Sequence, residues 1–175
     1  NALSARVETE VKRQGFVWRQ TFENGGHPVG GLRKGEETEE TGTTQTFYPD
    51  PEIFETTEFD FETLRARFQQ MAFLNKGLRI VLTDERQLDD VTEEIAEDGA
   101  EDDAPKHRSV DYMYANGLLD YVHHLNSSKK VEVIHDDIIA FETEDNDKKM
   151  AVEMALQWTT AYSESVHTYA NTINT

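Results

Sequence analysis

Two closely spaced glycine pairs are the first candidates in this sequence for a phosphate-binding site. Gly25-Gly26 and Gly30-Gly31 lie close together, and glycine-rich loops can cradle phosphate groups with their backbone amides. A phosphate loop also needs a Gly-Lys-Ser or Gly-Lys-Thr ending that opens a helix, and the sequence contains none. Residues 23–40 hold five glycines and a charged run that begins at Arg33, so we expect a loop-like, flexible surface connection there.

Histidine, serine and carboxylate side chains give no specific catalytic or metal-binding pattern. His123 and His124 are adjacent and cannot share a helix face, and no two histidines have the four-residue spacing of a helical zinc site. Ser163, Glu164 and His167 are the residue types of a catalytic triad, but no nucleophile elbow accompanies them. Paired carboxylates are uninformative in a chain with 35 acids. We therefore predict no catalytic residue and no metal ligand within this chain.

The negative charge is concentrated in one stretch. The formal net charge is −18, and residues 84–103 alone contain eleven acids and one base. Such dense like charge resists compact packing, so we predict a disordered or weakly helical insert. A calcium loop would need regularly placed oxygen ligands around a central glycine, and that spacing is absent. Because acidity repels phosphate, the composition gives no indication that this chain alone binds nucleic acid.

Length and composition also indicate how large a core the chain can form and where in the cell it is expected. A chain of 175 residues can bury roughly 70% of the surface that it exposes when unfolded, which is enough for a real core. It has no cysteine, no signal peptide and no apolar run near the ~20 residues that span a bilayer, so we expect a soluble, cytoplasmic protein without a membrane partner. The sequence starts without Met and stops just after a strand pattern, which indicates a segment of a longer polypeptide.

The N-terminal half is patterned as a sheet. Apolar and polar residues alternate through residues 6–22, with Gly15 at a turn, and predict a β-hairpin. Residues 41–48 predict a further strand, which Pro49-Asp50-Pro51 ends because proline removes a backbone donor.

A helix and a strand are expected next. Apolar residues recur at the helical spacing of three and four: Phe61, Leu64, Phe68 and Met71. Asp60 can cap the helix, and Asn75-Lys76-Gly77 can stop it. Residues 78–82 then alternate with the two-residue period of a half-buried strand.

The C-terminal half resumes a regular pattern after the acidic stretch. The expected elements are a helix that begins at Leu118 and ends near Asn126-Ser127-Ser128, and strands over residues 138–143, 151–158 and 165–170. The order of strands and helices gives an α+β fold.

Several long runs resemble the B-type proteins of DNA gyrases, the ATPase subunits of type IIA topoisomerases. The first is MAFLNKGLRIVLTDER, preceded by TGTTQTFYP and PDPEIFETTEFDFETL. The second is YANGLLDYVHHLNSSKK, followed later by VEMALQWTTAYSESVHTYANTINT. Together they cover nearly all of the chain except the acidic stretch. The B-type subunit of topoisomerase IV shares both regions and stays an alternative, and an acidic, non-enzymatic interaction module is a third.

The resemblance implies a division into domains. Residues 1–83 are similar to the C-terminal part of an α/β-sandwich ATPase domain of the gyrase, chaperone, histidine-kinase and mismatch-repair superfamily. Residues 84–108 form an acidic insert or linker, and residues 109–175 are similar to the start of a ribosomal-protein-like transducer domain. The transducer passes the state of the nucleotide to the DNA-cleaving core of the enzyme.

The resemblance also implies two ligand-binding residues. Thr43 matches the family's threonine that helps to hold adenine through an acidic partner and water, although its β-branched shape equally suits a strand. Arg13 matches an arginine at the rim of the pocket that contacts aminocoumarin inhibitors, although a solvated turn cation is the plainer interpretation. Where the family usually has an aliphatic residue near the base, this sequence has Gln45.

The remaining implications concern the intact subunit. ATP and Mg²⁺ are the expected cofactors, and the magnesium ligand and the catalytic groups lie outside this chain in the family. We therefore expect these 175 residues alone to be inactive as an ATPase. The expected partners are DNA, the gyrase A subunit and a second copy of the ATPase subunit, since ATP binding dimerises the ATPase domains.

Overall fold

The computed structural model describes residues 1–86 and 107–175. These residues form two compact units, Asn1–Phe59 and Asp60–Thr175. Within the described part of the chain, no helix is long and apolar enough to cross a membrane. Residues 87–106, most of the insert predicted over residues 84–108, lie outside the described residues.

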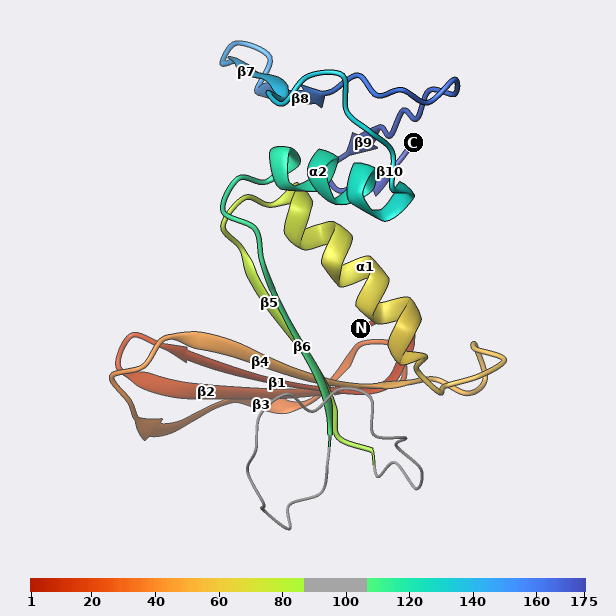
Figure 1. Ribbon diagram of the computed structural model, residues 1–175. Coiled ribbons are helices and arrows are strands. Elements are labelled where there is room, and N and C mark those ends of the chain that lie inside the picture. Colours follow the sequence, from red (N-terminus) through yellow and green to blue (C-terminus); the bar gives the residue numbers. More distant parts are fainter. Residues whose placement is uncertain (87–106) are drawn as a thin grey trace, which may run out of the picture. The chain divides into compact units, whose positions relative to one another are not determined.

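The first unit is an antiparallel sheet of four strands in the order β3-β2-β1-β4 (Figure 1). Its strands are β1 Ser4–Arg13, β2 Phe16–Glu23, β3 His27–Glu37 and β4 Gly42–Pro49. The predicted hairpin is confirmed: β1 and β2 pair in register through a turn at Gln14 and Gly15, with φ of 56° and 79°. Both turn residues have positive φ, the backbone that matches the twist of a two-residue hairpin. The strand predicted over residues 41–48 is also confirmed, as β4.

The prediction of a loop over residues 23–40 is wrong, because His27–Glu37 form strand β3 at the edge of the sheet. Its register against β2 shifts twice, and Gly30 has a φ of 71°, so glycine serves here to bend an edge strand. The charged run also belongs to the strand: Lys34 lies with its Nζ atom 3.2 Å from the centre of the Phe16 ring. The glycines and charges that suggested a loop are therefore features of a solvated edge.

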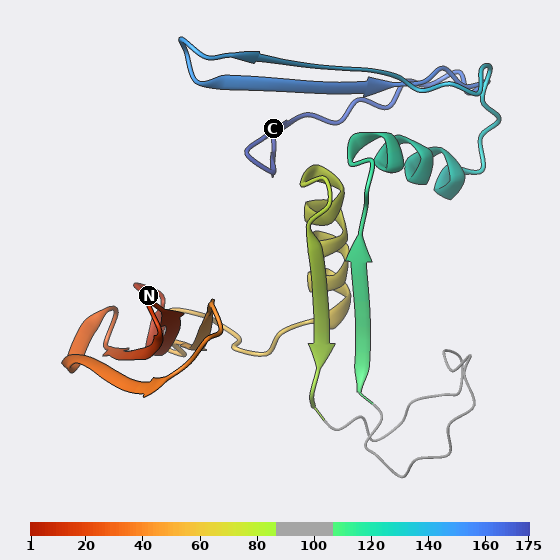
Figure 2. The same cartoon turned by 90° about the vertical axis from the view of Figure 1, so that its left-hand side faces the viewer.

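The second unit begins with helix α1, Phe61–Leu74, which packs against strands β5, Arg79–Asp84, and β6, Arg108–Met113 (Figures 1 and 2). The backbone amide of Thr63 donates to Asp60 Oδ1 at 2.7 Å, which confirms the predicted cap. The helix ends at Leu74 and Gly77 takes a φ of 77°, as predicted for the stop. Its buried residues are Phe61, Ala72 and Phe73.

Strand β6 was not expected from the sequence, and it changes the edges of the predicted linker. It pairs with β5 through a continuous antiparallel register from Arg79 opposite Met113 to Asp84 opposite Arg108. Asp84 and Arg108, predicted as the ends of a linker, are therefore strand residues. Asp84 is only 8% exposed, and its carboxylate accepts hydrogen bonds from Arg86 and Arg108. The predicted domain boundaries at 83/84 and 108/109 stay predictions.

The C-terminal elements follow the predicted order with different lengths. They are helix α2 Leu118–Lys129, strands β7 Ile139–Asp145 and β8 Met150–Leu156, and the short strands β9 Tyr169–Ala170 and β10 Ile173–Asn174. The predicted helix is confirmed: it ends at Lys129, directly after the predicted stop at Asn126-Ser127-Ser128, and Lys130 takes a left-handed conformation. The strand predicted over residues 165–170 keeps only its last two residues, which pair with β10.

Candidate functional site

The residues predicted to bind ligands share one face of the four-stranded sheet. Strands β1 and β4 pair so that Val11 lies opposite Thr43 and Thr9 lies opposite Gln45. Directly opposed side chains of an antiparallel pair point to the same face, and so do side chains two residues apart along a strand. Thr43 and Gln45 are therefore neighbours on this face, and Arg13 ends β1 two residues beyond Val11. The two predicted residues, Thr43 and Arg13, are exposed, and so is Gln45.

A hollow of about 620 Å³ opens on the same face of this unit. The strands line it with Val7, Thr9, Phe22, Gln45 and Phe47, and the segment of residues 54–59 lines one side. Phe47 meets Phe59 edge to face, with ring centres 5.9 Å apart and an interplanar angle of 88°. The structure thus brings Gln45 into the hollow, whereas Thr43 and Arg13 lie further along the same face and are not among the residues that line it.

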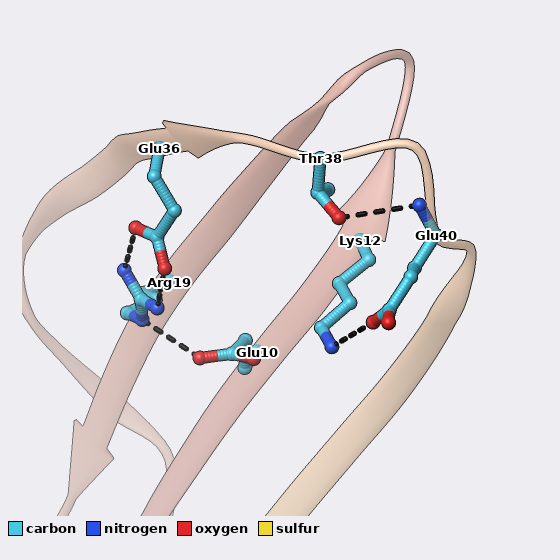
Figure 3. Close-up of polar contacts among 6 residues, drawn as sticks. All are labelled: Glu10, Lys12, Arg19, Glu36, Thr38 and Glu40. Atoms are coloured by element: carbon cyan, nitrogen blue, oxygen red, sulfur yellow. Dashed lines mark hydrogen bonds and ion pairs between the residues drawn. The ribbon is translucent and has the colours of Figure 1, made fainter.

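The opposite face of the sheet is covered with paired charges (Figure 3). The guanidinium of Arg19 donates to both carboxylate oxygens of Glu36, at 2.7 and 2.8 Å, and to Glu10 at 2.8 Å, while Lys12 donates to Glu40. The hydrogen bond from Arg19 lowers the pKa of Glu36 to about 2, so this carboxylate stays ionised at neutral pH. Each of these cations already has a carboxylate partner, and exposed pairs of this kind contribute little to stability.

The two faces suit different chemistry. Hydroxyl and amide groups above an apolar floor, as on the face with Thr43 and Gln45, suit a flat, uncharged ring system that accepts and donates a few hydrogen bonds. On the paired face, Arg6, Lys12 and Arg19 each lie beside a carboxylate. Gly30-Gly31 lies within edge strand β3 instead of at the start of a helix, where a phosphate-binding loop would place it.

The structure also locates the other residues considered for chemistry. The His124 ring packs against Phe73 at 5.2 Å between ring centres, and His123 Nδ1 lies 3.2 Å from Ser127 Oγ. Among the described residues, no group of three or more His, Cys, Asp or Glu side chains could hold a metal ion. Residues of the hollow that the sequence did not indicate as a site include Thr9, Phe22 and Phe47. Their alternation along the strands indicated a shared face, but only the pairing of β1 with β4 identifies which face carries Thr43.

Comparisons with known proteins agree on one family. Residues 117–175 match the family model described as DNA gyrase B. The chain is 65% identical to the DNA gyrase B protein of Micrococcus luteus and 49% identical to that of Streptomyces coelicolor, and both alignments cover all of it. The chain spans about a quarter of those relatives, 27% and 25% of their lengths. The crystal structure of the 43K ATPase domain of Thermus thermophilus gyrase B in complex with an aminocoumarin matches with a TM-score of 0.77 and 27% identity, over 99% of this chain and 42% of that one.

Proposed function

Since this chain belongs to the DNA gyrase B family, we propose that it is part of the ATP-hydrolysing subunit of a DNA gyrase. The intact subunit uses ATP-driven dimerisation and strand passage to introduce negative supercoils into DNA. The observation that carries the proposal is the single sheet face shared by Thr43, Gln45 and Arg13, next to an apolar hollow. Its α+β fold is that of the gyrase B ATPase domain, which supports the proposal.

On this face the chain contributes to the binding of the adenine base. Thr43 presents an exposed hydroxyl, and it holds the base together with an acidic partner and a water that this chain does not supply. Gln45, at the place where the family usually has an aliphatic residue, adds an amide beside the apolar floor of the hollow. Apolar surface with a few placed polar groups is the usual lining of a site for a flat ligand.

The chemical step depends on groups elsewhere in the intact subunit. Mg²⁺, when bound, neutralises charge on the phosphates, and we propose that its ligand, the group that activates water and the glycine-rich lid are outside this chain. Phosphoryl transfer needs such groups to be positioned together. The role of these 175 residues is therefore to hold and orient the base, and we assign no catalytic residue among them.

The proposed partners follow from the same family. They are DNA, the gyrase A subunit and a second copy of the ATPase subunit, in the cytoplasm. The Thermus thermophilus structure contains an aminocoumarin, and we propose that this class of inhibitor contacts Arg13 here. Arg13 is suited to that role because it is exposed at the end of β1, on the face that carries Thr43.

Measurement of ATP turnover tests whether the catalytic groups lie outside these 175 residues. The isolated 175 residues should hydrolyse no more ATP than a buffer blank, whereas the intact subunit should turn over ATP and, with its gyrase A partner, supercoil a relaxed plasmid. Turnover well above background by the isolated chain would disprove the placement of the catalytic groups. An intact subunit that decatenates linked circles but adds no negative supercoils would belong to a topoisomerase IV.

A further inference from the structure

Helix α1 is joined to the C-terminal hairpin β9–β10 by polar contacts. The Arg67 guanidinium donates through Nη2 to the backbone carbonyl of Thr172 at 2.8 Å, and it also donates to the side-chain oxygen of Gln70. The Gln70 amide in turn donates to the Tyr169 hydroxyl at 2.9 Å. We call these three links, from Arg67 and Gln70 to Tyr169 and Thr172, the helix–hairpin contact. All of its members belong to the second compact unit.

Tyr169 extends the contact to helix α2. Its hydroxyl lies 2.9 Å from the Tyr121 hydroxyl, so three elements meet at one oxygen atom. Burial and the hydrogen bond with Tyr121 raise the pKa of Tyr169 to about 12, so this hydroxyl keeps its proton at neutral pH. A group that joins α1, α2 and the hairpin by hydrogen bonds has few alternative arrangements of equal energy, because each broken bond leaves a partly buried polar atom unpaired.

The turn held by Arg67 is strained. Asn171 and Thr172, the two residues between β9 and β10, have φ of 49° and 70°. Positive φ suits the turn of a short hairpin, and asparagine tolerates it, but a β-branched residue such as threonine does so rarely and at a cost. The carbonyl of this strained residue is the one that accepts from Arg67. The contact with α1 therefore holds the turn in a conformation that the threonine itself does not favour.

We propose that Arg67, Gln70 and Tyr169 are positioning residues that couple the state of the nucleotide to the transducer. The inference rests on the function proposed above. Helix α1 follows strand β4, which carries Thr43, whereas the hairpin lies in the segment matched by the gyrase B family model. The proposal requires two arrangements of this turn, one bound to the Arg67 guanidinium as in the structure and one released from it. An element of this kind can pass a change at one site to another.

The test compares two substitutions on the same helix of the intact subunit, assembled with its gyrase A partner. Arg67→Met removes the guanidinium but keeps the apolar stem. Arg65→Met is the matched control, because Arg65 is on the same helix but bonds to Glu62 at 2.7 Å and to Tyr112 of β6 instead of to the hairpin. ATP turnover is measured without DNA and with linear duplex DNA. We expect Arg67→Met to lower DNA stimulation about fivefold or more, and both variants to keep basal turnover within about twofold of wild type.

A second variant distinguishes a loss of coupling from a loss of the folded structure. Tyr169→Phe removes one hydroxyl and keeps the ring, so it should also lower DNA stimulation, while Tyr162→Phe, at a fully exposed tyrosine, should not. If Arg67→Met shows no cooperative melting transition, it is not folded, and the DNA stimulation of Tyr169→Phe tests the coupling instead. Normal DNA stimulation in the folded variants would overturn this inference alone. A wild-type subunit without ATP turnover would overturn the proposed function and this inference with it.

Discussion

Two aromatic clusters, one in each compact unit, differ in how deeply their rings are buried. In the sheet unit, the rings of Phe47 and Phe59 remain 54% and 46% exposed. In the second unit, Phe73 is 2% exposed and stacks on Tyr114, with ring centres 3.6 Å apart, and on Tyr121 at 5.0 Å. Exposed rings beside a hollow are available to a ligand or to another part of a protein, whereas stacked and buried rings hold elements together. Substitutions at the exposed rings beside the hollow should therefore change binding, and substitutions at the buried Phe73 stack should change stability.

The largest effect is expected where the second unit is most tightly packed. Phe73→Ala removes a buried ring from contact with Tyr114, Tyr121 and His124, and it should cost about 3–5 kcal/mol of unfolding free energy. Urea unfolding of the intact subunit, followed by circular dichroism, measures the loss. The control is Phe54→Ala, since Phe54 is 39% exposed and lines the hollow of the sheet unit. Equal losses in the two variants would contradict the difference between the units.

Substitution of Thr43 in the sheet should have a smaller effect, on nucleotide binding instead of stability. Thr43→Ala removes a hydroxyl from the proposed adenine-binding face and should weaken nucleotide binding to the intact subunit about tenfold, the worth of roughly one hydrogen bond. Thr44→Ala is the control, because Thr44 lies on the same strand opposite Glu10, on the face with paired charges. Isothermal calorimetry with a non-hydrolysable ATP analogue compares the two. Unchanged affinity after Thr43→Ala would remove Thr43 from the site.

The sequence predicts the sheet well where apolar residues alternate and poorly at its edge. Strands β1 and β2 were predictable because one residue in two packs against a neighbour. Strand β3 was not, since every residue of it is exposed and no packing requirement imposes a pattern. Strand β6 was missed for another reason: its partner β5 lies across the acidic stretch, so Thr83 pairs with Ser109 through a contact between distant parts of the sequence.

The candidate site was also predictable only in part, because it depends on pairing between distant strands. The resemblance indicates Thr43 and Arg13 separately, but their common face depends on the pairing of β1 with β4, which joins segments separated by β2 and β3. Residues 54–59 follow a Pro-Asp-Pro turn and have no periodic pattern, so their place beside the hollow was also not predictable. Residue types indicate which chemistry is available, and long-range pairing decides which residues meet.

Acidification should produce a still smaller and local change in the sheet. The pKa of Glu36 is lowered from 4.5 to about 2 by its hydrogen bonds with Arg19. A carboxylate with a lowered folded pKa stabilises the fold above about pH 4.5, and this contribution is lost as the pH falls towards 2. NMR titration of the Glu36 side chain should give a midpoint near 2 in the wild type, and Arg19→Gln should move that midpoint up towards 4.5. A wild-type midpoint near 4.5 would show that the pair does not form in solution.

The smallest effect is expected from removing most of the acidic stretch. Deletion of residues 88–103 leaves seven residues between Asp84 and Arg108, which already lie opposite each other at the ends of β5 and β6. The buried Asp84 carboxylate, bonded to Arg86 and Arg108, holds these ends together without the deleted residues. ATP turnover by the intact subunit should therefore stay within about twofold of wild type, because a shorter loop changes the entropy of closure only slightly.

Asp84→Asn is the contrasting variant to this deletion. It removes the charge that both arginines bind, and it should lower the melting temperature of the intact subunit although it deletes nothing. The deletion should leave that melting temperature nearly unchanged, because the paired ends of β5 and β6 keep their register. A large loss of turnover from the deletion, with a normal melting temperature, would instead show that the acidic stretch takes part in the reaction.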